Sequence, residues 1–225
     1  MIRPLVALDV GATKIACAIG LPREHAPGFE LLGSSLVPYP TLSDTWLGDA
    51  LMVGQTIEQA LEATAVTGDF SRALVAMNHP LLRSEQVRAA VALGDEPTSV
   101  RMQDLDRLQA AAFHQVLGVD REPLMVERLG CAGNGFAGVR DPWGLPATRL
   151  LGTFHIVTMP MAAHRALVQA VESAGLEVIR LTYTLAAVWA SVSDEPLRRT
   201  RVLLVDVGGL TTDVGLAVDG ILRAS

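Results

Sequence analysis

The sequence predicts an α/β protein in which an inserted subdomain interrupts a larger domain. Three observations predict this fold class. Short apolar runs alternate with amphipathic stretches, the texture changes over residues 78–158, and two similar glycine turns lie near the two ends of the chain. With 225 residues, half of them apolar, the chain can bury a sizeable core as one large domain or two modest ones.

The first third of the chain predicts four strands and one helix. The strands cover Leu5–Val10, its hairpin partner Ile15–Ile19, Phe29–Val37 and, after the helix, Ala73–Met77. The helix takes Ser43 or Asp44 as its N-terminal cap and Gly68 as its stop, because short polar side chains bond free amides and glycine ends helices. Its apolar face is expected to hold Leu47, Ala50, Leu51, Ile57 and Leu61.

Residues from about Asn78 to Thr158 are interpreted as the inserted subdomain. Their clearest element is a helix over Asp104–Leu117, whose apolar face holds Leu105, Leu108, Ala112 and Val116. After the insertion, Pro160 is placed in the first turn of a helix that ends at Gly175, with an apolar stripe of Leu167, Val168 and Val171. The remaining predicted elements are a strand Val178–Thr182, a short helix to about Val192, a polar connection over 193–201 and a strand Val202–Val207.

Composition excludes several classes of protein. A net charge of −6 leaves no basic surface for a phosphate backbone, so no nucleic-acid partner is expected. Cys17 and Cys131 stand in no metal-binding or redox spacing, which favours a reducing cytoplasm. No apolar stretch approaches the roughly 18 residues of a membrane-spanning helix, so no transmembrane segment is expected. The mean hydropathy of +0.34 predicts apolar surface that meets a partner or a further domain.

The two ends of the chain share one motif. Residues 8–14 are Leu-Asp-Val-Gly-Ala-Thr-Lys and residues 205–213 are Val-Asp-Val-Gly-Gly-Leu-Thr-Thr-Asp. Each copy combines a strand, an aspartate, a glycine turn and hydroxyl side chains. Taken singly, either copy also fits a tight hairpin turn between core strands. The pair favours a phosphate clamp, because glycine lets backbone amides approach an anion closely.

Each residue type in the motif suits a part of that clamp. Amides and hydroxyls around the turns would bind phosphate, and one lysine would add positive charge near a terminal phosphate. The predicted phosphate-binding residues are Gly11, Ala12, Thr13, Lys14, Gly208, Gly209, Thr211 and Thr212. Asp9 and Asp206 would repel the anion unless a hydrated Mg²⁺ lies between, so both are predicted to hold Mg²⁺ through water. No residue is predicted as a catalytic base.

Paired turns of this kind resemble the actin, Hsp70 and sugar-kinase superfamily, in which two ribonuclease-H-like halves grip ATP. Within that superfamily the chain is most similar to the bacterial cell-division family FtsA. The similar segments are Asp9–Lys14, Asp141–Gly144, Phe154–Thr158, Ala174–Leu176 and Asp206–Gly209. The resemblance implies an actin-like mixed sheet, with residues 1–77 and 159–199 as the first ribonuclease-H-like subdomain, 78–158 as the FtsA-type insertion, and 200–225 as the first strands of an incomplete second half.

The resemblance also implies a function. An FtsA-like protein binds ATP and Mg²⁺, associates with itself through the inserted subdomain and links the division-ring protein FtsZ to the inner face of the membrane. It would be cytoplasmic, held at the membrane through partners or a C-terminal helix, and at most a slow ATPase. The chain departs from the family at Leu210, where a third glycine is usual, and it ends at Ser225, before the adenine-binding segments. It is therefore expected to be either a fragment or truncated copy of such a protein, or a degenerate relative that binds nucleotide poorly or not at all.

Two other functions stay open at this point. The segment Gly11–Lys14 also resembles the first turn of sugar kinases, which would make the chain a small-molecule kinase, although no segment supplies the aspartate that deprotonates a hydroxyl. A pilus-assembly adaptor of the PilM type would share the insertion and differ in its partner. The Gly133–Gly138 segment fits a dinucleotide-binding pattern but lacks a following helix, so it is predicted to be a loop between strands of the insertion.

Overall fold

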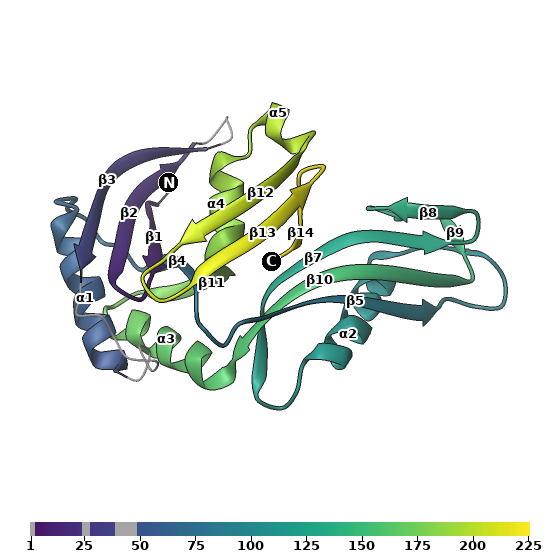
Figure 1. Ribbon diagram of the computed structural model, residues 1–225, viewed down its shortest axis with the longest axis horizontal. Coiled ribbons are helices and arrows are strands. Elements are labelled where there is room, and N and C mark those ends of the chain that lie inside the picture. Colours follow the sequence, from purple (N-terminus) through teal and green to yellow (C-terminus); the bar gives the residue numbers. More distant parts are fainter. Residues whose placement is uncertain (1–2, 24–27, 39–48) are drawn as a thin grey trace. The chain divides into compact units, whose positions relative to one another are not determined.

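The computed structural model describes residues 3–23, 28–38 and 49–225 and divides into two compact units (Figure 1). The first unit comprises Met1–Leu81, Pro160–Val188 and Asp206–Asp213, and the second comprises Leu82–Met159, Trp189–Val205 and Val214–Ser225. Each unit is described by itself below.

A five-stranded mixed sheet forms the centre of the first unit, with the order β11-β4-β1-β2-β3. Its strands are β1 Leu5–Val10, β2 Lys14–Pro22, β3 Phe29–Pro38, β4 Arg72–Met77 and β11 Glu177–Tyr183. β1 is antiparallel to β2 and parallel to β4, which is in turn parallel to β11. The predicted strands and the predicted mixed sheet are confirmed.

Helices α1 (Ala50–Ala63) and α3 (Met161–Ser173) pack on each other and against this sheet. Alternate residues of the inner strands are buried, because successive side chains of a strand point to opposite faces. The buried core contains Val6, Leu8, Val10, Ile15, Ile19, Val75 and Met77 from the strands and Val53, Ile57, Leu167 and Val171 from the helices. Since Leu8 and Val10 fill this core, Asp9 between them is turned to the other face of the sheet.

Helix α1 differs from its prediction at both ends. The expected caps Ser43 and Asp44, and Leu47 of the expected apolar face, lie outside the described residues. The described helix takes Asp49 as its cap, whose carboxylate accepts a bond from the amide of Met52 at 2.9 Å. The helix ends at Ala63, ahead of the predicted stop at Gly68, because Thr64 bonds back to Leu61 and Ala65 adopts a positive φ of 57°.

One side chain of the predicted apolar face of α1 was wrongly placed. Leu51 is 67% exposed, whereas the buried positions of the helix follow the spacing around Ile57. On α3, the predicted stop at Gly175 is confirmed: its φ of 78° is a conformation that glycine adopts easily, and its amide bonds Glu172. Pro160 is the residue that precedes α3, which begins at Met161.

The second unit contains a four-stranded sheet with the order β5-β10-β7-β8. Its strands are β5 Arg83–Ala92, β7 Arg121–Gly133, β8 Phe136–Val139 and β10 Arg149–Pro160. Helix α2 (Met102–Val116) covers one face of this sheet, and the short strands β6 (Thr98–Ser99) and β9 (Pro146–Ala147) pair beside it. The predicted helix is confirmed, and the loop predicted within Gly133–Gly138 is a tight turn at residues 134–135, because Gly133 ends β7 and Phe136 begins β8.

Phe154 lies at the centre of the core between α2 and this sheet. It is 1% exposed and packs in a cluster with Leu105, Leu108 and Ala112 of the helix. Alternate residues of β10, among them Leu150 and Ile156, point into the same core. The other residues of the strand therefore face the side of the sheet that α2 leaves uncovered.

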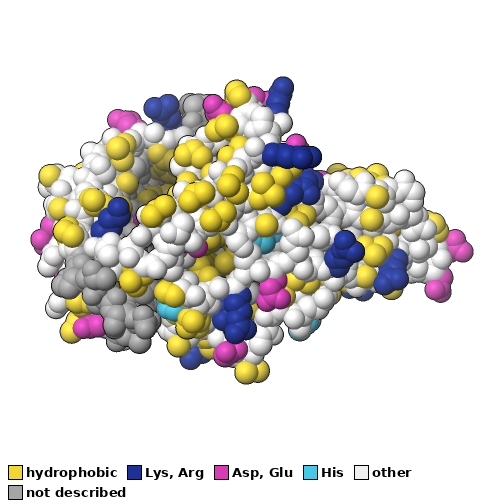
Figure 2. All heavy atoms as spheres, viewed as in Figure 1, with side chains coloured by type: hydrophobic (Ala, Val, Ile, Leu, Met, Phe, Trp, Pro, Cys, Tyr) yellow, Lys and Arg dark blue, Asp and Glu magenta, His cyan; other side chains and the backbone are white. Residues whose placement is uncertain are grey.

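A three-stranded sheet, ordered β12-β13-β14, follows two helices near the end of the chain. Its strands are β12 Arg201–Val207, β13 Thr212–Val218 and β14 Ile221–Ala224, and the helices are α4 Thr184–Val192 and α5 Glu195–Arg198. One face buries Leu204, Ala217 and Leu222, while the other exposes apolar side chains: Leu203, Val205, Val214 and Leu216 are between 40% and 65% exposed. Figure 2 shows hydrophobic side chains gathered over β12 and β13, which accounts for part of the high mean hydropathy.

His155 joins β14 to β10 inside the second unit. Its ring is fully buried, and Nδ1 lies 3.0 Å from the carbonyl oxygen of Leu222. Because a carbonyl only accepts, Nδ1 carries the proton and Nε2 accepts, with the hydroxyls of Ser84 at 2.8 Å and Ser225 at 3.2 Å beside it. Burial lowers the pKa of His155, although its bond to Leu222 opposes the shift.

The stability of the protein is therefore expected to decline as the pH falls below the ordinary histidine pKa of 6.5. In that range the unfolded chain binds a proton that the folded chain does not, so His155 contributes up to about 1.4 kcal/mol per pH unit to the slope. His155→Gln should remove this part of the slope, and His114→Gln, at an exposed site on α2, should keep it. Urea unfolding between pH 5 and 8 measures both, and equal slopes for the two variants would contradict the assignment.

Candidate functional site

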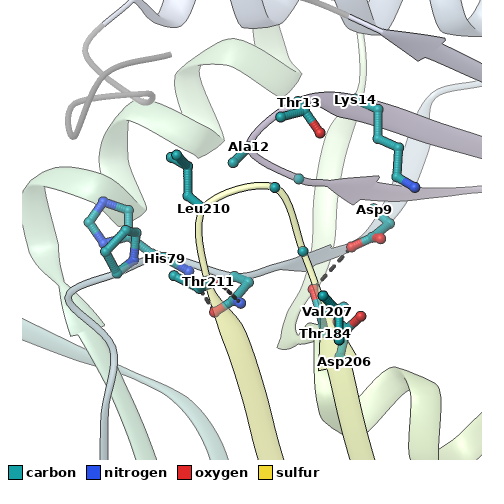
Figure 3. Close-up of a pocket in the computed structure, with 15 residues that line it drawn as sticks. Asp9, Ala12, Thr13, Lys14, His79, Thr184, Asp206, Val207, Leu210 and Thr211 are labelled. Atoms are coloured by element: carbon teal, nitrogen blue, oxygen red, sulfur yellow. Dashed lines mark hydrogen bonds between the residues drawn. The ribbon is translucent and has the colours of Figure 1, made fainter. Parts of the chain in front are cut away.

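The two glycine turns of the first unit line one cavity of about 190 Å³ (Figure 3). The turn between β1 and β2 contributes Gly11 to Lys14, and the turn between β12 and β13 contributes Gly208 to Thr211. Asp9 and Asp206 precede the two turns and also line the cavity. The cavity is smaller than the roughly 300–1,000 Å³ of typical small-molecule pockets, so its size fits phosphate groups and not a complete nucleotide.

The two turns are closed by the same backbone bond. The amide of Gly11 donates to the carbonyl of Lys14 at 3.1 Å, and the amide of Gly208 donates to the carbonyl of Thr211 at 2.9 Å. A Cβ atom on either glycine would lie 3.0–3.1 Å from that same carbonyl oxygen. Glycine is therefore favoured at the first position of each turn, because any side chain there would press on the returning backbone.

The tips of the two turns are in direct contact. A Cβ atom built on Gly209 would lie only 2.4 Å from the methyl carbon of Thr13. Gly209 thus faces the opposite turn, whereas the neighbouring Leu210, where a third glycine was expected, is 41% exposed and lines the cavity. The side chain of Leu210 does not prevent the approach of the turns, because the contact is made one residue earlier.

Asp9 carries the clearest electrostatic signal of the site. Burial raises its pKa, and the nearby carboxylate of Asp206 raises it further, while a bond from Thr184 and the charge of Lys14 lower it. The hydroxyl of Thr184 donates to Oδ1 of Asp9 at 3.0 Å. Figure 3 shows Asp9, Thr184 and Asp206 gathered on one side of the turns. Two carboxylates in a partly buried cavity favour a cation between them.

A hydrogen-bond network around Asp213 holds the second turn. The side-chain Nδ2 of Asn78 donates to the hydroxyl of Thr211 at 2.9 Å and also to Oδ2 of Asp213. The hydroxyl of Tyr183 donates to Oδ1 of the same aspartate at 3.0 Å. Since Asn78 follows β4 and Tyr183 ends β11, this network fixes the second turn against two strands of the central sheet.

The structure brings most of the predicted site residues together. All ten line the cavity except Thr212, which is exposed at the start of β13. Sequence reasoning missed Asn78, His79 and Thr184, which also line it. A signal was available for two of them: Asn78 and Thr184 are polar residues that directly follow parallel strands, and the carboxyl ends of parallel strands meet at one edge of a sheet.

The residues present fit a hydrated divalent cation. Among residues 3–23, 28–38 and 49–225, no three His, Cys, Asp or Glu side chains form a metal-binding group. Magnesium needs no such group, because it keeps several waters and is bound by one or two carboxylates together with phosphate oxygens. Asp9 and Asp206 supply that number of carboxylates beside the turns.

The fold and the facing turns define an actin-like protein. Among solved structures, a PilM–PilN type IV pilus biogenesis complex superposes on 94% of this chain with a TM-score of 0.66 at 13% identity. This likeness covers 57% of the solved chain. At that identity the similarity concerns the fold, and it includes both units of the present structure.

Within proteins of this fold the chain is similar to FtsA. A family model described as the SHS2 domain inserted in FtsA matches residues 81–158. The cell division protein FtsA of Pseudomonas aeruginosa is 28% identical over 97% of this chain, and FtsA of Borreliella burgdorferi is 27% identical over 96%. The resemblance stated from the sequence motifs is confirmed.

The chain spans about half the length of these relatives, 52% in both cases. Within the part of the chain that the structure describes, no helix is long and apolar enough to cross a membrane.

Proposed function

We propose that this chain acts as an FtsA-like, actin-fold adaptor in bacterial cell division that binds the phosphates of ATP. The observation that carries the proposal is the convergence of two glycine turns on one cavity in a chain that is similar to FtsA over 97% of its residues. In such an adaptor ATP acts as a ligand that favours one conformation over another.

Each part of the cavity has a role in this proposal. The turn amides and the hydroxyls of Thr13 and Thr211 bind phosphate oxygens, and Lys14 adds positive charge. Asp9 and Asp206 bind the waters of Mg²⁺, which neutralises the phosphate charge when it is bound. Thr184 orients the carboxylate of Asp9 through its bond to Oδ1.

An adaptor fits this cavity better than a small-molecule kinase. Among the described residues, Asp9 and Asp206 are the carboxylates that line it. Assigning both to magnesium leaves no carboxylate there to deprotonate a substrate hydroxyl, which a kinase requires. Hydrolysis of ATP by such a site would be slow.

The proposed partners follow from the relationship with FtsA. The chain contacts an FtsZ-like division-ring protein, associates with itself through the inserted subdomain, and works in the cytoplasm at the inner face of the membrane. Its acidic charge of −6 agrees with protein partners and not with nucleic acid.

A comparison of two ligands tests the phosphate clamp. Because the cavity fits phosphate groups alone, ATP and inorganic tripolyphosphate should bind this chain with similar affinity when Mg²⁺ is present, and weakly, with a Kd of about 1 mM. At a tenfold excess over that Kd, either ligand should stabilise the fold by about 1.4 kcal/mol. Thermal unfolding with and without EDTA measures the effect, and a complete lack of stabilisation by both ligands would exclude the clamp.

Asp9→Asn should weaken ligand binding while it raises the stability of the fold. The raised pKa of Asp9 means that its ionised form is less favourable in the folded chain, so its contribution to stability is lost as the pH rises through that pKa. The variant should therefore be more stable than the native chain at pH 7. Magnesium-dependent binding of tripolyphosphate should weaken at least tenfold, or by about 1.4 kcal/mol.

Asp69→Asn, at an exposed site of the same unit, is the matched control for this prediction. This control should change neither the stability at pH 7 nor the affinity for tripolyphosphate. A variant at Asp9 that is less stable than the native chain, with unchanged affinity, would show that the carboxylate serves the fold and not a cation.

A pilus-assembly adaptor is the second candidate, favoured by the TM-score of 0.66 to the PilM–PilN complex. The two functions differ in the position of the protein in the cell. A fluorescent fusion expressed in the source bacterium should gather at the division site under the first proposal and at pilus machinery under the second.

A further inference from the structure

The second unit contains an open groove of about 410 Å³ on the face of its sheet that α2 leaves uncovered. In the register of β10 with β5, Thr153 lies opposite Arg88 and Leu151 lies opposite Ala90. The groove is lined by Gln86, Arg88, Leu129, Gly130, Leu151 and Thr153, together with Arg223 of β14. Its size is in the range of pockets that hold ligands.

The charges of the groove are all of one sign. Arg88 and Arg223 line it, and none of the described aspartates or glutamates does. The three ion pairs found among the described residues use other arginines, Arg107, Arg140 and Arg199. The Nε atom of Arg223 is moreover buried without a hydrogen-bond partner in the described part of the chain. Such a group is costly to bury alone and gains most from a carboxylate.

The strand that carries Arg223, β14, is held in place by side chains of two neighbouring strands. Gln86 donates to the backbone oxygen of Arg223 at 2.8 Å, and His155 bonds the preceding carbonyl of Leu222 at 3.0 Å. These bonds fix the backbone of β14 beside β5 and β10, and Arg223 lines the groove from that strand. These contacts do not use the charge of the side chain, which stays available for a ligand.

The groove also offers apolar contact and room for a backbone. Leu151 is 44% exposed within it. Gly130 and Gly138 lie against each other, with a Cβ built on the first only 3.5 Å from the backbone of the second, so no side chain narrows the groove there. An extended segment with apolar and acidic side chains matches this lining, because its carboxylates can meet the two arginines while its apolar residues cover Leu151.

We propose that this groove is a docking site for an acidic peptide segment of a partner protein, with Arg88 and Arg223 pairing to its carboxylates. Two arginines in a chain of net charge −6 are too few for a polyanion, which selects extended basic surfaces. The site lies within the second unit and is independent of the phosphate clamp.

Binding of two peptides to the full chain tests the proposal. The probe is a fluorescein-labelled dodecapeptide of alternating Asp and Leu, and its matched control replaces every Asp with Asn. Fluorescence anisotropy should give a Kd of about 100 µM or tighter for the acidic peptide and at least a tenfold weaker one for the amide peptide. Equal affinities would overturn the proposal, and tighter binding of a heparin oligosaccharide than of the acidic peptide would assign the groove to polyanions instead.

Two arginine variants locate the site. Arg88→Gln and Arg223→Gln should each weaken binding of the acidic peptide about tenfold, and Arg223→Lys should restore part of the loss. Arg199→Gln, which removes an exposed arginine that directly follows α5 in the same unit, should have no effect. Arg88 is exposed, so its variant tests the groove even if Arg223→Gln fails to fold. Losses equal to that of Arg199→Gln would place the peptide elsewhere and overturn the proposal.

Discussion

Phe154→Ala is expected to lower the free energy of unfolding of the second unit by about 3–5 kcal/mol, the range for removing a buried phenylalanine side chain. Phe154 is 1% exposed and packs between β10 and helix α2, in contact with the cluster around Leu105 and Leu108. Gly152, two residues earlier on the same face, already lies against Leu108. The surrounding backbone is therefore close-packed and cannot collapse far into the cavity that the substitution leaves.

Phe29→Ala is the matched control, since the same side chain is removed at a position that is 55% exposed. It should cost no more than about 1 kcal/mol. Hydrogen exchange of the α2 and β10 amides, combined with urea unfolding, measures the two variants. Similar losses in both would mean that the core of the second unit does not depend on packing under α2.

Gly54→Leu is expected to destabilise the first unit by about 3 kcal/mol, at the upper end of the cost of overpacking. Gly54 is buried on α1 where the helix meets α3. A Cβ atom there would lie 2.2 Å from the hydroxyl oxygen of Ser173 and 3.0 Å from the carbonyl oxygen of Ala170. Ser173 can rotate away, but the backbone of Ala170 cannot, so the two helices have to separate.

Gln55→Leu controls for the effect of leucine on the helix itself, because Gln55 is exposed on the same turn of α1. It should be neutral or slightly stabilising, since leucine is a good helix former. Circular dichroism during urea unfolding is sufficient for both variants. If Gly54→Leu were as stable as the control, the contact between α1 and α3 would have to be looser than the structure describes.

Much of the fold is predictable because its signals are local. The strands β1, β2, β4 and β12 are apolar runs that end at glycine or polar residues, and Gly175 ends α3 in the left-handed conformation that glycine favours. The exposure of Leu51, by contrast, could not be predicted from the residues around it in the sequence. It depends on which side of α1 meets α3 and the sheet, and a single apolar residue on the boundary of a helix face does not decide that.

The candidate site likewise has one part that the local sequence predicts and another part that it does not. Its turns are sequence motifs, and each is closed by a bond between residues three apart. The groups that support the turns come from far along the chain: Thr184 bonds Asp9 across 175 positions, and Asn78 bonds Thr211 across 133. The groove beside Arg223 could not be predicted from the sequence at all. It forms only where β14 meets the face of the sheet that α2 does not cover.

The contact between Thr13 and Gly209 has a consequence for the rate at which a long phosphate ligand enters. The tips of the turns touch, so a ligand that extends beyond the cavity has to find them apart or push them apart. If the parted form is a small fraction of the population, the measured affinity is the intrinsic affinity reduced by that fraction. The rate of ligand entry then reaches a maximum at high ligand concentration. That maximum equals the rate at which the tips of the two turns separate.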